Sequence, residues 1–251
     1  MYFDWLQFQW HLKELQTLYP KFLSIETIGY AGQYPLYKVK TTGATSRQRR
    51  LRVLVTAGTH GTEPVGVASA LDLLERYGRD KSFRDKVELV VFPALNPWGL
   101  SRFSRRNQQG VDINRSFLDG QESENSRLLM KDLSGESFDL ALDLHGARSF
   151  YEHFLIRGAA DGGLAENSIR AISKKDRLDS ETGEYPGSFG GYTLFNEGVS
   201  ESSNMGTMKS YAFDQLRIPY AYTFEYPGKV NPRQTHRLNF RLVMSMINHL
   251  L

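Results

Sequence analysis

The chain has 251 residues, of which 40% are hydrophobic and 24% are charged. These proportions are typical of globular proteins and exclude a fibrous or disordered chain. The length suits one large domain that covers residues 1–251. The 31 basic residues exceed the 28 acidic ones by only three, which argues against a nucleic-acid partner. Because the chain contains no cysteine, disulfides and thiolate metal ligands are excluded, and a tightly held metal would need histidine and carboxylate ligands.

The N-terminal segment predicts a helix rather than a targeting or membrane segment. Residues 5–18 place apolar side chains near helical spacing, and Asp4 precedes them as a candidate N-cap. No basic stretch typical of an export signal comes first, and no run approaches about 18 uninterrupted apolar residues. We therefore expect a soluble, cytoplasmic protein without a membrane partner.

The middle of the chain predicts strands that alternate with helices. Residues 51–57 (LRVLVTA) have the β-branched, apolar composition of a buried strand, and the polar residues 41–50 before them predict a hairpin or a loop. Pro64 is a favoured first helical residue, and the apolar spacing over 65–77 continues a helix from it.

A second buried strand is predicted over residues 87–94, and the arginine-rich residues 96–116 after it indicate a long functional loop. The rest of the chain predicts helices over 125–133, 164–175, 208–216 and 235–251, strands over 138–144, 151–156 and 220–224, and surface loops over 181–206. This alternation predicts a single α/β domain with a central mixed, largely parallel twisted sheet flanked by helices.

Three polar side chains follow predicted strands directly: His60, His145 and Glu225. In open α/β sheets, ligand sites assemble at the carboxyl ends of the strands, so these residues are expected to share one cleft. His60 and Glu63 stand three residues apart where a loop enters a helix, and two histidines with one glutamate are a known zinc ligand set.

Each of these residues also has a structural explanation. A His-x-x-Glu pair often serves as a helix cap or a surface pair, and a lone histidine such as His145 is often buried and hydrogen bonded to the backbone. Asp143, two residues before His145, fits either a carboxylate that orients the histidine or a structural acid, and the sequence leaves both open.

Five motifs follow one another in a fixed order along the chain: His60-x-x-Glu63, Asn96-Pro97-x-Gly99, Arg105-x-Asn107-x-x-Gly110-Val111-Asp112-x-Asn114-Arg115-x-Phe117, His145 and Glu225. From about residue 50 to residue 230, this order resembles the zinc carboxypeptidase family of metallopeptidases. The third motif is the most specific part of the resemblance. The resemblance implies a carboxypeptidase-like fold and one zinc ion per chain, held by His60, Glu63 and His145.

The resemblance also implies roles for other residues. Arg105, nine residues before Asn114, would stabilise the developing oxyanion, with Arg106 as the alternative. Asn114 and Arg115 would hold the terminal carboxylate of a substrate, a task for which a planar guanidinium is suited.

Glu225 resembles the catalytic glutamate of the family, which acts as general base toward water activated by zinc. The expected activity is therefore that of a zinc metallocarboxypeptidase, a hydrolase of peptide or peptide-like amide bonds next to a free carboxylate. Its partner would be a small peptide or peptide-like substrate.

One feature departs from the digestive members of the family, which carry a tyrosine about twenty residues before the glutamate. Residues 198–209 contain no tyrosine, Tyr192 lies too early, and Tyr211 is expected to pack on a helix. The related murein-peptide amidases and the aspartoacylase and desuccinylase branch have altered substrate loops. An N-acyl amino acid deacylase and a non-catalytic binding module therefore stay open as alternatives, as do the side-chain preference and the oligomeric state.

Overall fold

The computed structural model describes residues 3–42, 49–146, 154–158, 163–172, 188–189, 192–196, 205–225 and 231–251, and for 154–155, 188–189 and 192–196 it describes the backbone alone. Its strands are β1 Leu23–Ala31, β2 Tyr34–Thr41, β3 Leu51–Ala57, β4 Val87–Phe92, β5 Leu140–Leu144, β6 Phe154–Gly158, β7 Ser188–Phe189, β8 Tyr192–Asn196 and β9 Tyr220–Glu225. Its helices are α1 Trp5–Leu18, α2 Pro64–Arg79, α3 Lys81–Lys86, α4 Pro97–Arg102, the 3-10 helix η1 Ile113–Arg115, α5 Glu124–Leu133, α6 Leu164–Ala171, α7 Met208–Asp214 and α8 Pro232–His249.

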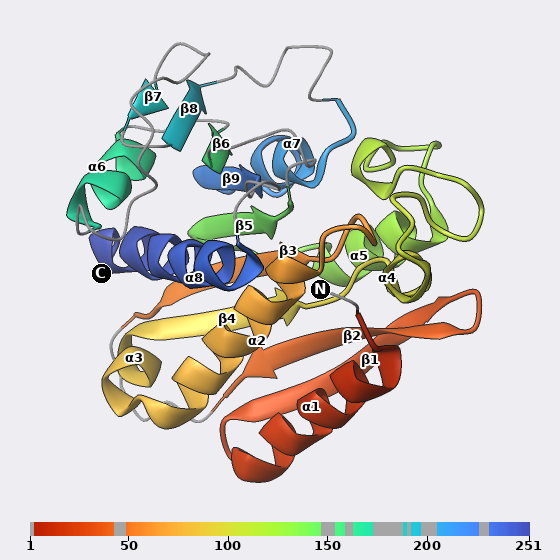
Figure 1. Cartoon of the computed structure of the whole chain (residues 1–251), viewed down its shortest axis with the longest axis horizontal. Helices are drawn as coiled ribbons and strands as arrows, with labels where there is room; N and C mark the ends of the chain where they lie inside the picture. The colour runs from red at the N-terminus through yellow and green to blue at the C-terminus, as the bar shows by residue number, and fades with distance from the viewer. Residues whose placement is uncertain are drawn as a thin grey trace.

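The described strands form one mixed sheet in the order β1-β2-β4-β3-β5-β9-β6-β8-β7 (Figure 1). The four strands β4, β3, β5 and β9 at its centre are parallel to one another. Antiparallel pairs flank them, between β2 and β4 on one side and between β9 and β6 on the other. The predicted mixed α/β fold is confirmed. Because β3, β5 and β9 are parallel neighbours, their carboxyl ends, which carry the predicted site, meet at one edge of the sheet.

Helices cover both faces of the sheet, and the alternation of side chains along each strand supplies both cores. Val53 and Val55 of β3 pack in one cluster with residues of α2 and α8, whereas Leu54 between them packs with α5 and α7 on the other face. Because β3 is buried on both faces of the sheet, its sequence is an apolar run and not an alternation of apolar and polar residues. In Figure 1, α2 and α8 lie side by side over the first of these faces.

Several predicted helices and strands are confirmed with small changes at their ends. The first helix spans Trp5–Leu18, and Asp4 caps it by accepting a hydrogen bond from the backbone N–H of Gln7. The helix expected from Pro64 runs on to Arg79. The strand expected over 151–156 and the helix expected over 164–175 are seen as β6 and α6. The helix ends at Ala171, and residues 151–153 and 173–175 lie outside the described ranges.

The structure corrects three expectations. The strands β1 and β2 form a hairpin that was not predicted, although Gly32, with φ of +60°, marks its turn. The loop over 96–116 contains α4 and η1, and α4 begins where the side chain of Asn96 accepts a hydrogen bond from Gly99. The expected loop over 181–206 contains β7 and β8. Among the described residues, none of the helices combines the length and the apolar character needed to cross a bilayer.

Candidate metal centre

The loop between β3 and α2 carries His60 and Glu63. Glu63 stands at the N-cap position of α2, directly before Pro64, so the start of the helix sets its position. The loop is packed tightly against the turn after α4: the Gly61 N–H donates to the Ser104 carbonyl at 3.0 Å. A Cβ atom on Gly61 would lie 1.9 Å from the carbonyl carbon of Gly99. Only glycine fits at position 61, and this close approach holds the loop in place.

The side chains of His60, Glu63 and His145 converge on one point. The Nδ1 atom of His60 lies 2.9 Å from Oε1 of Glu63, and Nδ1 of His145 lies 2.9 Å from Oε2 of Glu63. The two Nδ1 atoms are 3.1 Å apart. Two ligands about 2.0–2.1 Å from a tetrahedral zinc ion are separated by about 3.3 Å, so this spacing fits a bound zinc ion. The three side chains are 3%, 7% and 0% exposed.

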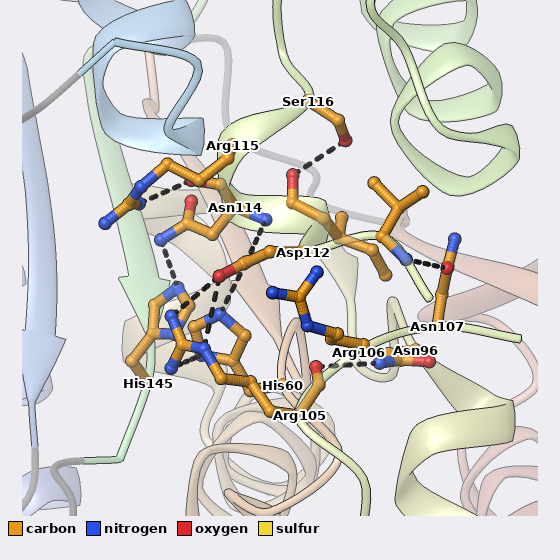
Figure 2. A network of polar contacts seen from close by, with 12 residues as sticks. His60, Asn96, Arg105, Arg106, Asn107, Asp112, Asn114, Arg115, Ser116 and His145 are labelled. Atoms are coloured by element: carbon orange, nitrogen blue, oxygen red, sulfur yellow. Dashed lines mark hydrogen bonds and ion pairs between the residues drawn. The ribbon is translucent and has the colours of Figure 1, made fainter. Parts of the chain in front are cut away.

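A carboxylate lies behind each imidazole, and Figure 2 shows the one behind His60. Nε2 of His60 lies 3.0 Å from Oδ1 of Asp112. Nε2 of His145 lies 2.7 Å from Oδ2 of Asp143, whose Oδ1 accepts a hydrogen bond of 2.7 Å from the hydroxyl of Thr56. A carboxylate at Nε2 fixes the ring orientation and leaves Nδ1 to face the metal. Asp143 thus contacts His145, as expected for the first of the two roles that the sequence left open.

The charges of this cluster suit a divalent cation. Three carboxylates, those of Glu63, Asp112 and Asp143, contact the two imidazoles, and one guanidinium, that of Arg105, lies beside them, so negative charge predominates when both histidines are neutral. Burial raises the pKa of Glu63, but the hydrogen bonds with His145 and His60 outweigh it and lower this pKa to about 2. Burial opposes the charged form of His145, yet Asp143 and Glu63 raise its pKa well above the usual value. The acidic surroundings therefore favour a positive charge at the centre.

Arg105 reaches the centre and Arg106 does not. The Arg105 guanidinium donates two hydrogen bonds, of 2.9 and 3.1 Å, to Oδ2 of Asp112, and its Nη1 lies 3.3 Å from Nδ1 of His60. Arg106 is exposed and donates to the carbonyl of Gly110 at 2.7 Å. Of the two arginines considered from the sequence, the structure places Arg105 at the site.

Asn114 and Arg115 lie beside the centre in different surroundings. Asn114 is buried: its Nδ2 lies 3.2 Å from Nε2 of His145, and its Oδ1 accepts a hydrogen bond of 2.9 Å from the backbone N–H of Met208. Its amide therefore connects η1, His145 and the start of α7. Arg115 is exposed, and its Nη1 donates to the Asn114 carbonyl at 2.6 Å. Of this pair, Arg115 is the residue that an incoming anion can reach.

Glu225 ends β9, next to the strand that leads to His145. The backbone N–H of His145 donates to the carbonyl of Phe224 at 2.8 Å, which ties the two strand ends together. Burial, together with the negative charge of Glu63, raises the pKa of Glu225 to about 7, although the positive charges of the histidines and Arg157 act in the opposite direction. A carboxylate with this pKa is suited to exchange protons near neutral pH.

Buried amides hold the loop that carries Arg105 and Asp112. Oδ1 of Asn107 accepts hydrogen bonds from the backbone N–H groups of Gln109 and Val111, and its Nδ2 donates to Asn125 at 3.1 Å. Asn125, at the start of α5, donates in turn to the carbonyl of Leu95 at 2.7 Å. The sequence assigned no role to Asp112 or Asn107, although both lie in the most specific motif. Their position within that motif was the signal that could have identified them.

The tyrosines considered as candidates for the site contribute nothing to the described geometry. Tyr211 is buried on α7, stacks on Phe117 with ring centroids 5.9 Å apart, and so packs as expected. Tyr192 begins β8, but its side chain and residues 198–204 lie outside the described parts.

Comparison with known proteins identifies relatives of this chain. The sequence model of the zinc carboxypeptidase family matches residues 9–249. The chain is 25% identical over 130 residues to an inactive metallocarboxypeptidase of Ajellomyces capsulatus (strain H143), a match that covers 42% of this chain and 22% of that protein. It is 35% identical over 74 residues to carboxypeptidase 2 of Trichophyton rubrum, covering 28% of this chain and 14% of that protein. These matches span less than a quarter of the curated relatives' own length.

Solved structures share the fold over nearly the whole chain. A candidate metallopeptidase from Shewanella amazonensis SB2B has a TM-score of 0.78 at 21% identity, with 98% of this chain and 93% of that chain covered. A metallo-carboxypeptidase from Burkholderia cenocepacia has a TM-score of 0.78 at 17% identity, with 99% and 69% covered. One from Pseudomonas aeruginosa, in complex with (2-guanidinoethylmercapto)succinic acid, has a TM-score of 0.73 at 15% identity, with 99% and 69% covered. Sequence and fold together show that the chain belongs to the zinc carboxypeptidase family.

Proposed function

We propose that the protein is a zinc-dependent metallocarboxypeptidase, which binds one zinc ion per chain and hydrolyses a peptide or peptide-like amide bond next to a free carboxylate. The observation that carries the proposal is the convergence of Nδ1 of His60, Nδ1 of His145 and the carboxylate of Glu63, with a further carboxylate at Nε2 of each histidine. We expect these three residues to hold the metal, as in other sites with two histidines and one glutamate.

The position of a side chain supports each proposed role. Zinc, when bound, polarises the scissile carbonyl and makes water acidic enough to lose a proton near neutral pH. Glu225 accepts that proton at a carboxylate oxygen and returns it to the leaving amine nitrogen. The Arg105 guanidinium, which faces the cluster, balances the negative charge that develops on the carbonyl oxygen. Arg115 binds the free carboxylate of the substrate in the geometry of two parallel N–H donors.

Asn114 has a different proposed role from the one that the resemblance implied. Its amide already contacts Nε2 of His145 and the Met208 N–H, so binding a substrate carboxylate would require it to leave both partners. We infer that Asn114 positions Arg115 and His145, and that Arg115 is the main anchor of the carboxylate.

The main alternative is an N-acyl amino acid deacylase with the same metal centre, favoured by the absence of tyrosine from residues 198–209. A non-catalytic module is the second alternative, since one relative is named as inactive. Against it, the metal-binding triad, Arg105 and Glu225 are all present here. A comparison of peptides, murein peptides and N-acyl amino acids as substrates of the zinc-loaded protein separates these three possibilities.

Replacement of the proposed base tests catalysis. Glu225→Gln keeps the size of the side chain but cannot accept a proton, so we expect kcat to fall by roughly 10²- to 10⁴-fold. Zinc content, measured by elemental analysis, should stay at one ion per chain because Glu225 is not a proposed ligand. A variant with near-normal turnover would remove Glu225 from this role.

Removal of the carboxylate anchor tests the substrate class. Arg115→Ala should lower kcat/KM toward a free-acid peptide by the equivalent of about 2 to 5 kcal/mol, because a carboxylate would be left unpaired in the cleft. The same peptide with an amide cap should be a poor substrate for the wild type and little affected by the substitution. If the wild type cleaves capped and free peptides equally well, the carboxylate-binding role is wrong.

A further inference from the structure

The turn after α4 presents an aromatic side chain to solvent in an unfavourable backbone conformation. Phe103 has φ of 53° and ψ of 42°, which is the left-handed helical region. Its side chain is 60% exposed. Glycine is the usual residue at such a position, because a Cβ atom is strained there. Phe103 therefore gains little burial in return for the strain of its backbone.

The conformation is imposed by the tight packing of this turn. The N–H groups of Phe103 and Ser104 both donate to the carbonyl of Gly99. Gly99 in turn lies against the backbone of Gly61, where no Cβ atom could be accommodated. The turn is thus held between α4 and the loop of the metal centre, and the chain must turn left-handed at residue 103.

Phe103 lies close in the chain to the proposed catalytic centre. It is two residues from Arg105, so their Cα atoms are at most about 7.6 Å apart. The next residue, Ser104, accepts a hydrogen bond from Gly61, which follows the proposed ligand His60. In the view of Figure 2, the backbone of Arg105 and that of Arg115 lie on opposite sides of the two imidazoles. A substrate whose carboxylate is held by Arg115 would therefore extend past the metal toward Arg105 and Phe103.

We propose that Phe103 is a specificity-determining residue, which contacts an apolar side chain of the substrate on the acyl side of the scissile bond. This inference rests on the proposed peptidase function. The neighbouring Arg102 does not cover the ring, because its guanidinium lies 4.9 Å from the ring of Trp98 and donates to the hydroxyl of Tyr34 at 2.9 Å. The phenyl ring is thus open to contact from solvent, and contact with an apolar group of the substrate would explain why phenylalanine stands where glycine is usual.

The test compares two acetylated dipeptides with free carboxylates, which differ only in having phenylalanine or glycine on the acyl side of the cleaved bond. We expect the zinc-loaded wild type to prefer phenylalanine. Phe103→Gly should lower kcat/KM for this peptide by about 5- to 30-fold, as expected for the loss of one apolar contact, and leave the glycine peptide little changed. Phe103→Tyr should restore most of the preference.

Arg217 supplies a matched control. With a φ of 56°, it is the other non-glycine residue with positive φ in the described parts of the chain. It lies before β9, away from the carboxyl ends of the strands. Relief of backbone strain in Arg217→Gly and Phe103→Gly should keep or raise the Tm of both. The kinetic preference should change in Phe103→Gly alone.

The outcomes separate this inference from the function on which it rests. Equal losses for both peptides in Phe103→Gly would show that the turn only positions Arg105, and no loss for either would show that the ring is not in contact with substrate. Either result overturns the role of Phe103 and leaves the peptidase function intact. Dissociation constants of both peptides on the Glu225→Gln background give the same comparison without turnover. If neither peptide is bound or cleaved, the proposed function fails and the inference with it.

Discussion

At the scale of single residues, the centre depends on which nitrogen of each histidine faces inward. Both His60 and His145 direct Nδ1 toward Glu63 and Nε2 toward an aspartate. The two aspartates differ in their support. Asp112 lies in a loop and is bound by Arg105, whereas Asp143 lies within β5 and is 2% exposed. The support of His145 is therefore the more rigid of the two.

This difference leads to a prediction for Asp143. Asp143→Asn preserves the shape of the side chain but removes the charge that holds Nε2 of His145, so zinc affinity should fall by about 10- to 100-fold. A competition titration of the metal-free protein against a fluorescent zinc chelator measures this change. Thr56→Val, which removes only the hydroxyl bound to Asp143, should have a smaller effect. An unchanged zinc dissociation constant in a folded Asp143→Asn protein would assign Asp143 a purely structural role.

At the scale of helices and strands, each residue of the centre is placed by a strand that ends and a loop that packs on its neighbour. The β3 strand leads to His60, α2 begins after Glu63, and β5 leads to His145. Gly66 in α2 packs against the carbonyl of Leu144, where a Cβ atom would lie 2.3 Å from the oxygen. The contact between α2 and the end of β5 therefore keeps the two histidines at a constant separation.

The packing of α2 against α8 should depend on pH. Nε2 of His236 on α8 lies 3.0 Å from Oδ2 of Asp72 on α2, and the Asp72 carboxylate raises the pKa of His236. Because the pKa of His236 is higher in the folded than in the unfolded protein, its charged form stabilises the fold. This stabilisation is complete below the pKa of the unfolded state, about 6.5, and is lost as the pH rises through the pKa of the folded state. The pair of His236 and Asp72 is partly exposed, so it should contribute about 0.2 to 1 kcal/mol to the free energy of unfolding.

Urea unfolding of Asp72→Asn and of the wild type at several pH values checks this expectation. The free energy of unfolding of the variant should be lower than that of the wild type at pH 6 and equal to it at pH 9. A difference that stays constant across this range would show that the charge on His236 is not involved.

At the scale of the whole molecule, the proposed ligands follow the neighbouring parallel strands β3 and β5, and a bound cation would therefore stabilise the folded chain. Zinc at 100 times its dissociation constant should add about 2.7 kcal/mol to the free energy of unfolding. For a chain of this size, this corresponds to a rise in Tm of roughly 5 to 10 °C. Calorimetry with and without zinc measures the shift, and a chelator should reverse it.

The control for this prediction is His145→Ala, which removes the proposed ligand that follows β5. This variant should show little zinc-dependent change in Tm. A full shift in His145→Ala would mean that zinc stabilises the protein from another site.

The sequence by itself determined the elements whose patterns are local. The apolar run of β3, the proline that begins α2 and the polar residues directly after β3, β5 and β9 were enough to predict a mixed α/β sheet with a site at one edge. They were enough because side-chain periodicity and strand ends depend on neighbours along the chain. The order of motifs from His60 to Glu225 was enough to identify the family.

Only the tertiary structure decided which side chains meet. The hairpin of β1 and β2 was missed because its strands lie at the margin of the sheet and are only partly buried, so their pattern is weak. The contacts of His60 with Asp112, of Asn114 with Met208 and of Gly61 with Gly99 join residues between 38 and 94 positions apart. No local pattern encodes such pairs, because they form only when separate strands and loops pack at the same edge of the sheet.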